Sequence, residues 1–261
     1  MNLGESVEQN LLEFFRHFAR AHKSGKVAEL DGVSIASSGL DCHMFNAAFF
    51  SGPVIDSLDD LERRIGLASS HLSRRKQGWA FWACEGRLEG RIADRAAGAF
   101  ERREMRFAVR HPGMASEALS APNRSLASLE IRRVEQRQTR LALAHINAVA
   151  FGMPFDWCAE LYDVDGLWND DFAGYVGYRN GEAVTAAATL AAAEAIGVYC
   201  VATLPAHERN GCAEAVVRHA VAHGQQRSGL GRSILQSTPP GLPLYRRMGY
   251  EVVTHFSIYT G

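Results

Sequence analysis

The chain has 261 residues, of which 47% are hydrophobic and 22% are charged, and its formal net charge is −1 at neutral pH. These values are typical of a soluble protein with one large domain or two compact halves, and they exclude a disordered, collagen-like or disulfide-dense chain. A net charge so close to zero also argues against bulk electrostatic binding to nucleic acid or to an anionic membrane.

The sequence carries no targeting or metal-binding pattern. No apolar run approaches the roughly 18–20 residues of a membrane helix, and the first residues lack the basic-then-apolar order of a signal peptide. The cysteines are odd in number and widely spaced, so we expect reduced, mostly buried thiols in a cytoplasmic protein without a metal site. They are Cys42, Cys84, Cys158, Cys200 and Cys212.

Apolar spacing and turn residues predict few elements in the first half. The predicted elements are a helix over Val7–Lys23, a strand over Val33–Ala36, a helix from Leu58 to Leu72 capped by Asp56 or Ser57, and a strand over Trp79–Cys84 ended by a turn at Gly86. Residues 112–125 then combine two prolines with small polar residues and no strong apolar period. This composition predicts a boundary, with a linker over residues 116–125.

The second half shows clearer periodicity and reads as mixed α/β. The predicted strands are Leu126–Val134, Gly174–Arg179, Ala183–Ala192, Ile196–Thr203, Ser233–Gln236 and Tyr250–Tyr259, and the predicted helices are Thr139–Phe151, Trp157–Tyr162 and Gly211–Gln225. Asn180-Gly181 predicts a hairpin turn with positive φ.

The segment from Val198 to Ala213 contains the most informative pattern. A buried-looking strand is followed by a proline, a loop with Gly211 and Ala213 two residues apart, and an amphipathic helix. The unpaired N–H groups at a helix start, approached over small residues, can bind a phosphate. The same spacing also fits an ordinary helix start. It is neither a P-loop nor a dinucleotide fingerprint, because GxxxxGK(S/T) and GxGxxG are missing.

Two motifs in this half resemble those of the GNAT acetyltransferase superfamily. Pro205-x-x-x-x-x-Gly211-x-Ala213 is similar to its acetyl-CoA motif, Arg/Gln-x-x-Gly-x-Gly/Ala, and Leu244–Tyr250, with the sequence LYRRMGY, is similar to its closing segment. One position departs from the pattern, because Glu208 stands where Arg or Gln is usual. We expect Glu208 to point outward and Arg209 to supply the charge contact; alternatively, the loop binds the donor weakly or not at all.

The resemblance implies roles for particular residues. Val201 and Thr203 would pair with the pantetheine arm, and a backbone N–H near Cys200 would polarise the thioester carbonyl. Tyr245, with an ordinary pKa of ~10, would protonate the leaving thiolate, or would only pack beneath the last strand. The implied acetyl-CoA-binding residues are Val201, Ala202, Thr203, Glu208, Arg209, Asn210, Gly211, Cys212 and Ala213.

The acceptor side and the general base are less sharply indicated. Six acidic residues and several aromatics lie between Pro154 and Tyr178, with no Lys or Arg. Such a segment favours a cationic amine, with Asp156, Trp157 and Glu160 as candidate contacts, or it is a solvated surface over core aromatics. The candidates for the base are Glu194, His207 and His255, each also explicable as structural.

The first half has no convincing cofactor loop. Arg95-Ala96-Ala97-Gly98-Ala99-Phe100 matches part of the motif but places Phe where Gly or Ala is needed. By analogy with tandem members of the superfamily, we expect two GNAT-like halves, each a mixed, mostly antiparallel sheet flanked by helices. Residues 1–115 would be a degenerate copy, 116–125 a linker, and 126–261 the acetyltransferase domain.

The sequence thus predicts transfer of acetyl from acetyl-CoA to an amine on a small molecule or a protein, without a metal, nucleic acid or membrane partner, and it leaves the oligomeric state open. Two alternatives stay open. One is a non-catalytic acyl-CoA-binding or scaffold module, favoured by Glu208. The other is use of a longer acyl-CoA, for which the small residues at 186–188 and 191–193 would leave room.

Overall fold

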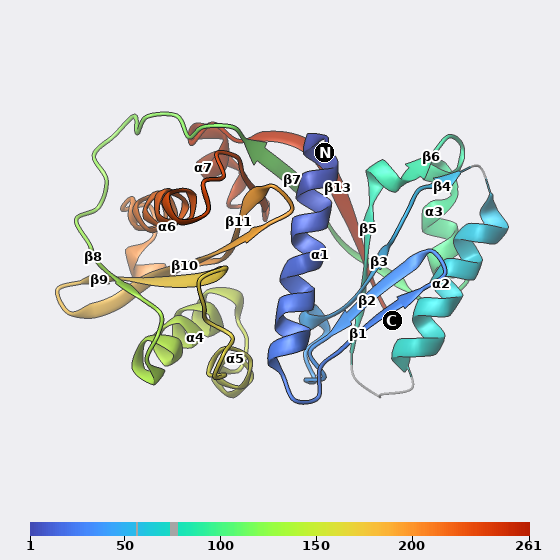
Figure 1. Cartoon of the computed structure of the whole chain (residues 1–261), viewed down its shortest axis with the longest axis horizontal. Coiled ribbons are helices and arrows are strands. Elements are labelled where there is room, and N and C mark those ends of the chain that lie inside the picture. The colour runs from blue at the N-terminus through green and yellow to red at the C-terminus, as the bar shows by residue number, and fades with distance from the viewer. Residues whose placement is uncertain (56, 74–77) are drawn as a thin grey trace. The chain divides into compact units, whose positions relative to one another are not determined.

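The computed structural model describes residues 1–55, 57–73 and 78–261 (Figure 1). The chain divides into two compact units, each assembled from two separate stretches. Unit 1 is Met1–Asn10 with Met114–Glu251, and unit 2 is Leu11–Gly113 with Val252–Gly261. The elements that run from one unit into the other are helix α1 (Leu3–Ala21) and strands β7 (Arg106–Ser116) and β13 (Glu251–Thr260).

Unit 1 is a mixed sheet with helices on both faces. Its elements are β8 (Glu130–Arg133), α4 (Arg137–Phe151), α5 (Phe155–Tyr162), β9 (Phe172–Arg179), β10 (Glu182–Ala192), β11 (Ala195–Thr203), the 3₁₀ turn η4 (Pro205–His207), α6 (Cys212–Ser228), β12 (Ser233–Gln236) and α7 (Leu242–Arg247). The strand order is β12-β11-β10-β9-β8. Only the β11–β12 pairing among these is parallel. Helix α6 lies on one face of β9–β11, and α4 lies on the other beside α5 (Figure 1).

Asn10 fixes the start of α1 to the sheet of unit 1. Its buried side-chain nitrogen lies 2.7 Å from the carbonyl oxygen of Ala192 and 3.0 Å from that of Ala195. Its side-chain oxygen accepts a hydrogen bond of 2.7 Å from the Tyr199 hydroxyl. A Cβ on Gly197 would lie 2.0 Å from the same oxygen, so this close approach requires glycine. A buried amide satisfied on both sides holds one specific geometry.

Unit 2 is a second mixed sheet, with α2 and α3 side by side on one face (Figure 1). Its elements are β1 (Lys26–Leu30), β2 (Val33–Ser37), the 3₁₀ turn η1 (His43–Phe45), β3 (Asn46–Phe50), β4 (Val54–Ile55), α2 (Leu58–Leu72), β5 (Ala80–Cys84), the 3₁₀ turn η3 (Glu85–Arg87), β6 (Leu88–Glu89) and α3 (Ile92–Glu101). The order is β1-β2-β3-β5-β13, and β4 pairs with β6 separately. The β3–β5 pairing is parallel, and its neighbours β2–β3 and β5–β13 are antiparallel.

The central strands of unit 2 are apolar on both faces because both faces are covered. Phe50 packs with Phe81 in the core beneath α2 and α3. The next residue along, Phe49, contacts Phe15 of α1 with ring centroids 5.3 Å apart. Successive side chains of a strand point to opposite faces. Phe50 therefore packs beneath α2 and α3, and Phe49 packs against α1 on the other face.

Most of the predicted elements of the second half are confirmed to within a few residues. The Asn180-Gly181 turn has φ values of 53° and 82°, as its sequence requires. In the first half the helix after residue 57 is capped by Ser57, whose hydroxyl accepts from the Asp60 N–H at 3.1 Å. The alternative cap, Asp56, lies outside the described residues. The mixed α/β class with largely antiparallel sheets is confirmed.

Several predicted boundaries are wrong. Helix α1 begins at Leu3 rather than Val7, because Asn2 and Glu5 bind each other's backbone N–H at 2.9 and 3.1 Å in a reciprocal cap. The strand predicted over Leu126–Val134 is only Glu130–Arg133. Strands β1, β3 and β7 and helix α3 were not predicted. The partial motif at residues 95–100 lies inside α3 rather than in a loop before a helix, and its Phe100 stacks on Tyr259 at 3.8 Å.

The predicted linker contributes to unit 1. The chain crosses between the units inside β7, at Gly113–Met114, and residues 116–125 belong with the unit that follows. The division into two similar halves stays a prediction. The cysteines are all free thiols, four of them buried and Cys200 half-buried. Among the described residues, no helix is both long and apolar enough to cross a bilayer.

Candidate functional site

The loop between β11 and α6 brings a helix start to the end of the central strands. After Thr203 the chain makes the short turn η4, and Arg209 and Gly211 both adopt positive φ, at 60° and 78°. Helix α6 then begins at Cys212, and Gly211 in the N-cap position offers no side-chain cap. The first backbone N–H groups of α6 therefore lack the usual capping acceptor.

A cavity of about 500 Å³ opens at this helix start. Eight of the nine predicted donor-binding residues line this cavity, together with Tyr245. The exception is Asn210, which borders a separate hollow beside Tyr178 and Arg179. The cavity lining is Arg124, Val201, Ala202, Thr203, His207, Glu208, Arg209, Gly211, Cys212, Ala213, Glu214, Thr238, Pro240, Gly241, Pro243, Leu244, Tyr245 and Arg247.

A β-bulge distorts β11 just before the cavity. Ala186 of β10 pairs with Ala202, but Ala188 pairs with Tyr199, so Cys200 and Val201 together oppose one residue. Cys200 has φ of 52°, which accommodates the extra residue. A bulge leaves backbone groups outside the ladder and turns the strand away from its neighbour. This is the point at which the sequence predicts contact with a bound acyl group.

Side chains of α4 and α5 pack around the bulge. The Asn147 amide approaches the Cys200 carbonyl oxygen at 3.5 Å, and the Tyr162 hydroxyl lies 3.6 Å from the Cys200 sulfur. Burial raises the pKa of the Cys200 thiol to about 12, so this thiol is neutral and is not an activated nucleophile.

Tyr245 lies on α7 and is 8% exposed. Its ring meets that of Tyr250 edge to face, with centroids 5.9 Å apart. Burial, with the neighbouring Tyr250, raises the pKa of Tyr245 well above the ordinary tyrosine value. The expectation of an ordinary pKa is therefore wrong, because the sequence does not reveal how deeply the ring is buried. The phenol remains protonated throughout the neutral range.

The cavity lining contains more charged residues than the sequence predicts. Glu208 and Arg209 both belong to the lining and both are exposed, and the outward orientation of Glu208 stays a prediction. Arg124, Glu214 and Arg247 also line it and were not predicted. Arg247 lies within the LYRRMGY motif, which could have indicated it. Arg124 had no such signal, because it lies in a segment with the composition of a linker.

The three candidate bases belong to different parts of the fold. His207 lines the cavity, and its Nε2 atom is 3.5 Å from a carboxylate oxygen of Glu182. Glu194 is exposed in the turn before β11, a full strand of nine residues away from Thr203. His255 belongs to unit 2. Of the three, the structure brings His207 to this cavity.

The predicted acceptor residues lie together on α5. Asp156, Trp157 and Glu160 are exposed, and they do not line the cavity described above. Helix α5 packs against α4, which reaches the bulge through Asn147. The predicted contacts therefore lie on α5, on the α4–α5 face of the sheet and outside the lining of this cavity.

Half of the predicted acidic cluster is already paired with arginine. Asp163 binds Arg137 and Arg140 at 2.9 and 2.8 Å, and Arg140 also binds Asp165 at 2.9 Å. Asp170 pairs with Arg133 and Arg227. These pairings correct the interpretation of the whole segment as a surface for a cation. Asp156 and Glu160 have no ion pair among the described residues.

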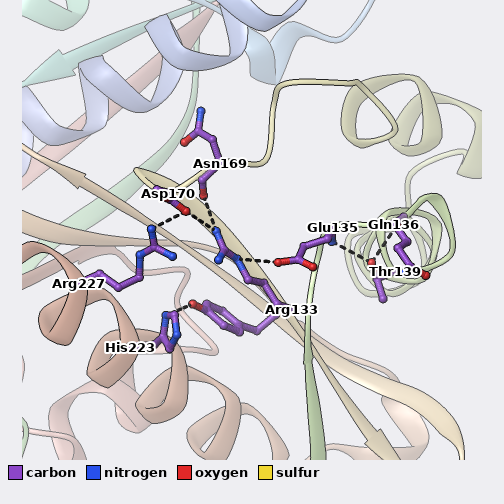
Figure 2. Close-up of polar contacts among 9 residues, drawn as sticks. Arg133, Glu135, Gln136, Thr139, Asn169, Asp170, His223 and Arg227 are labelled. Atoms are coloured by element: carbon purple, nitrogen blue, oxygen red, sulfur yellow. Dashed lines mark hydrogen bonds and ion pairs between the residues drawn. The ribbon is translucent and has the colours of Figure 1, made fainter.

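Asp170 anchors a polar network that links β8, the loop before β9 and the end of α6 (Figure 2). Arg133 donates to the Asp170 carboxylate and to the Asn169 carbonyl, both at 3.0 Å, and Arg227 pairs with the same carboxylate. Nearby, the His223 Nδ1 atom lies 2.7 Å from the Tyr175 hydroxyl. The arginines lower the pKa of Asp170. This network organises the far end of α6, away from Gly211.

No group of three or more His, Cys, Asp or Glu side chains suited to a metal ion occurs among the described residues. The cavity is lined by three arginines and by the Tyr245 phenol, a set of side chains that suits an anionic ligand.

Comparison with known proteins identifies a family match in unit 1 and similar folds. Residues 131–250 match the model of the acetyltransferase (GNAT) family. A GCN5-related N-acetyltransferase from Kribbella flavida superposes with a TM-score of 0.74 at 16% identity, covering 99% of this chain and 95% of that one. A GCN5-related N-acetyltransferase from Sphaerobacter thermophilus gives a TM-score of 0.60 at 14% identity, with 88% and 76% covered. A protein of unknown function from Staphylococcus epidermidis gives 0.62 at 12% identity, with 93% and 96% covered. No curated protein sequence matches the chain significantly.

Proposed function

We propose that the protein is an acyl-CoA-dependent N-acyltransferase, and that it transfers an acetyl group from acetyl-CoA to an amine by direct attack of the amine on the thioester. Residues 131–250, which match the GNAT acetyltransferase family, would carry this reaction. The observation that carries the proposal is the meeting of three features at one cavity. These are the bulged end of β11, the uncapped start of α6 and the Tyr245 phenol.

The residues present fit the donor. Gly211 and Ala213 leave the backbone N–H groups at the start of α6 accessible, and the partial positive charge there favours a pyrophosphate. Arg124, Arg209 and Arg247 add positive charge around the same cavity. The backbone of Val201 and Thr203 would pair with the pantetheine arm where β11 leaves the regular ladder.

Catalysis in this arrangement is mainly positioning. The acceptor ammonium first loses a proton to water, and its nitrogen then bonds to the acyl carbon as the carbon–sulfur bond breaks. The amide nitrogen gives its second proton to water, and the sulfur receives one from Tyr245, which regains it from solvent. A backbone N–H at residues 200–201 would stabilise the charge that develops on the carbonyl oxygen.

The acceptor we propose is a cationic amine, on a small molecule or on a protein. Residues 141–178 contain no Lys or Arg. Asp156 and Glu160 therefore form a negatively charged surface on α5, with the exposed Trp157 ring beside them. An ammonium group gains both an ion pair and a cation–π contact from this combination.

Calorimetric titration with acetyl-CoA tests donor binding. The matched variants are Gly211→Trp and Gly229→Trp, because both glycines adopt positive φ at opposite ends of α6. Gly211 lines the cavity, whereas a Cβ on Gly229 would have nothing within 4 Å. We expect the wild type and Gly229→Trp to bind and Gly211→Trp to lose binding. Equal binding by all three proteins would show that the donor binds elsewhere.

A turnover assay separates the enzyme from a non-catalytic acyl-CoA-binding module. Release of free thiol is measured with a panel of polyamines, aminoglycoside-like cations and peptide amines. Acetyl-CoA is compared with longer acyl-CoA donors, since the buried alanines 186–188 lie beside the bulge. Donor binding without thiol release from any pairing would contradict the proposed transfer.

A further inference from the structure

Residues 117–127 cross the start of α6 and the end of α7. The Ser120 N–H donates to the Met248 carbonyl at 2.9 Å, and Arg218 of α6 donates to the Ser120 carbonyl at 2.7 Å. A Cβ on Gly211 would lie 3.3 Å from the Ala127 nitrogen. We call residues 117–127 the crossing segment. Its single proline and its small residues resemble a linker in composition, but its backbone is held by Met248 and Arg218.

The crossing segment contributes one charged side chain to the cavity, Arg124. This guanidinium is 42% exposed, and its Nε atom is 3.8 Å from an oxygen of Glu214, in the first turn of α6. That distance is too long for a hydrogen bond. The guanidinium thus has an ion-pair partner that holds it near the helix start without fixing its donors.

Glu214 itself is paired elsewhere. Its other oxygen, Oε1, accepts from Arg218 at 2.9 and 3.0 Å. The carboxylate is 2% exposed, and its Oε2 atom, which faces Arg124, has no hydrogen-bond partner among the described residues. Because Arg218 already compensates the buried charge of Glu214, Arg124 can turn to another anion without leaving that carboxylate unpaired.

The remaining charges of the cavity are then predominantly positive. With Glu214 and Arg218 cancelling, Arg124, Arg209 and Arg247 outweigh Glu208. Glu208 occupies the motif position at which Arg or Gln is usual, so the loop itself supplies less positive charge than the motif normally does. Arg124 brings a planar, permanently charged donor set to the same place from a distant part of the sequence.

We propose that Arg124 binds a phosphate group of the acyl donor and that the crossing segment is part of the donor site. The proposal rests on the proposed function, since it concerns the same cavity and the same donor. The chemistry recognised is a phosphate, which could be the pyrophosphate or the 3′-phosphate of the donor. In the absence of donor, Glu214 keeps the guanidinium at the start of α6.

The test is calorimetric titration of the whole protein with CoA and with 3′-dephospho-CoA. The variants are Arg124→Ala and, as a control, Arg246→Ala, an exposed arginine of α7 that does not line the cavity. We expect Arg124→Ala to weaken CoA binding about tenfold, as for a lost charge-assisted hydrogen bond, and Arg246→Ala to stay within about twofold. A loss for CoA alone assigns Arg124 to the 3′-phosphate, and an equal loss for both ligands assigns it to the pyrophosphate.

Two further readings make the outcome decisive. Thermal melting of both variants should match the wild type, and the effect of Arg124→Ala should shrink near 1 M salt, where charges are screened within about 3 Å. Unchanged affinity in Arg124→Ala, or a loss of equal size at high salt, would overturn the inference while leaving the proposed function standing. If the wild type binds neither ligand, the proposed function and the inference both fail.

Discussion

The position that a Cβ of Gly211 would occupy lies 3.3 Å from the backbone nitrogen of Ala127. Two constraints therefore meet at this glycine. Its φ of 78° disfavours any side chain, and the crossing segment leaves almost no space for one. The residue in the N-cap position of α6 also sets how closely a distant segment can approach the start of this helix.

Gly211→Ala and Gly229→Ala should differ in stability, although both glycines adopt positive φ. We expect Gly229→Ala to lower the free energy of unfolding by about 1 kcal/mol, the cost of a left-handed backbone with a side chain. Gly211→Ala should cost about 1 kcal/mol more, because the crossing segment must shift. Urea denaturation of both variants measures the difference, and equal losses would mean that the Ala127 contact is unimportant.

Tyr245→Phe should separate donor binding from turnover. The ring and its edge-to-face contact with Tyr250 are kept, so melting temperature and acetyl-CoA affinity should not change. Loss of the proton donor should lower kcat about a hundredfold. Because the pKa of Tyr245 is raised, wild-type turnover should show no loss from phenol ionisation up to pH 10. The control is Tyr250→Phe, because Tyr250 is also buried but does not line the cavity. An equal kcat for the wild type and Tyr245→Phe would show that Tyr245 takes no part in the reaction.

Asn10→Ala should destabilise the protein more than Ser6→Ala. Both side chains are buried and bind the turn region before β11, but Ser6 makes one hydrogen bond, to the Ala193 carbonyl at 2.9 Å. Asn10 satisfies more than one carbonyl and the Tyr199 hydroxyl. We expect a loss of about 2–3 kcal/mol for Asn10→Ala and about 1 kcal/mol for Ser6→Ala. A smaller loss for Asn10→Ala in urea denaturation would contradict the anchoring role.

Glu85→Gln should change the pH dependence of stability. The Arg110 guanidinium donates to both Glu85 oxygens at 2.7 Å and, with Ser257, lowers the pKa of this carboxyl below its usual value. A lowered pKa stabilises the fold above the unfolded-state pKa of about 4.5, and the contribution is lost as pH falls through the lower folded-state value.

For this half-exposed pair the gain at pH 7 should stay below about 1 kcal/mol. Glu85→Gln should therefore be slightly less stable than the wild type at pH 7, and the two should converge as the pH falls toward 3. Glu130→Gln removes a carboxylate that also pairs with an arginine but on an exposed strand, so its curve should follow the wild type. A stability gap for Glu85→Gln that stays constant from pH 7 to 3 would refute the assignment.

The sequence predicted the strand, the loop and the helix start at residues 198–213 well because their signals are local. A strand, a proline, a positive-φ glycine and a helix start follow one another within about a dozen residues, and each has its own residue preference. Tyr245 could be placed because LYRRMGY follows in the expected order. These residues meet at the cavity through short connections around one helix.

What the sequence could not predict depends on contacts between distant residues. Arg124 reaches the cavity only because residues 117–127 pack across α6, and no periodicity marks that segment. The pairing of Asp163 and Asp170 with arginines likewise joins residues 23–57 positions apart. Strand β3 went unrecognised because Phe49 and Phe50 are both buried, which removes the alternation that identifies a half-exposed strand.

The anchoring of Asn10 also bears on how the chain folds as it is synthesised. Unit 1 needs residues from the first helix turns, and unit 2 needs Phe256 and its neighbours in β13 to pair with β5. Once residue 200 has emerged from the ribosome, the Asn10 amide can meet its carbonyl partners, whereas the sheet of unit 2 still lacks strand β13. The order of translation therefore favours early assembly around Asn10. The sheet of unit 2 is completed later, because β13 lies some 170 residues after Phe81 in the sequence.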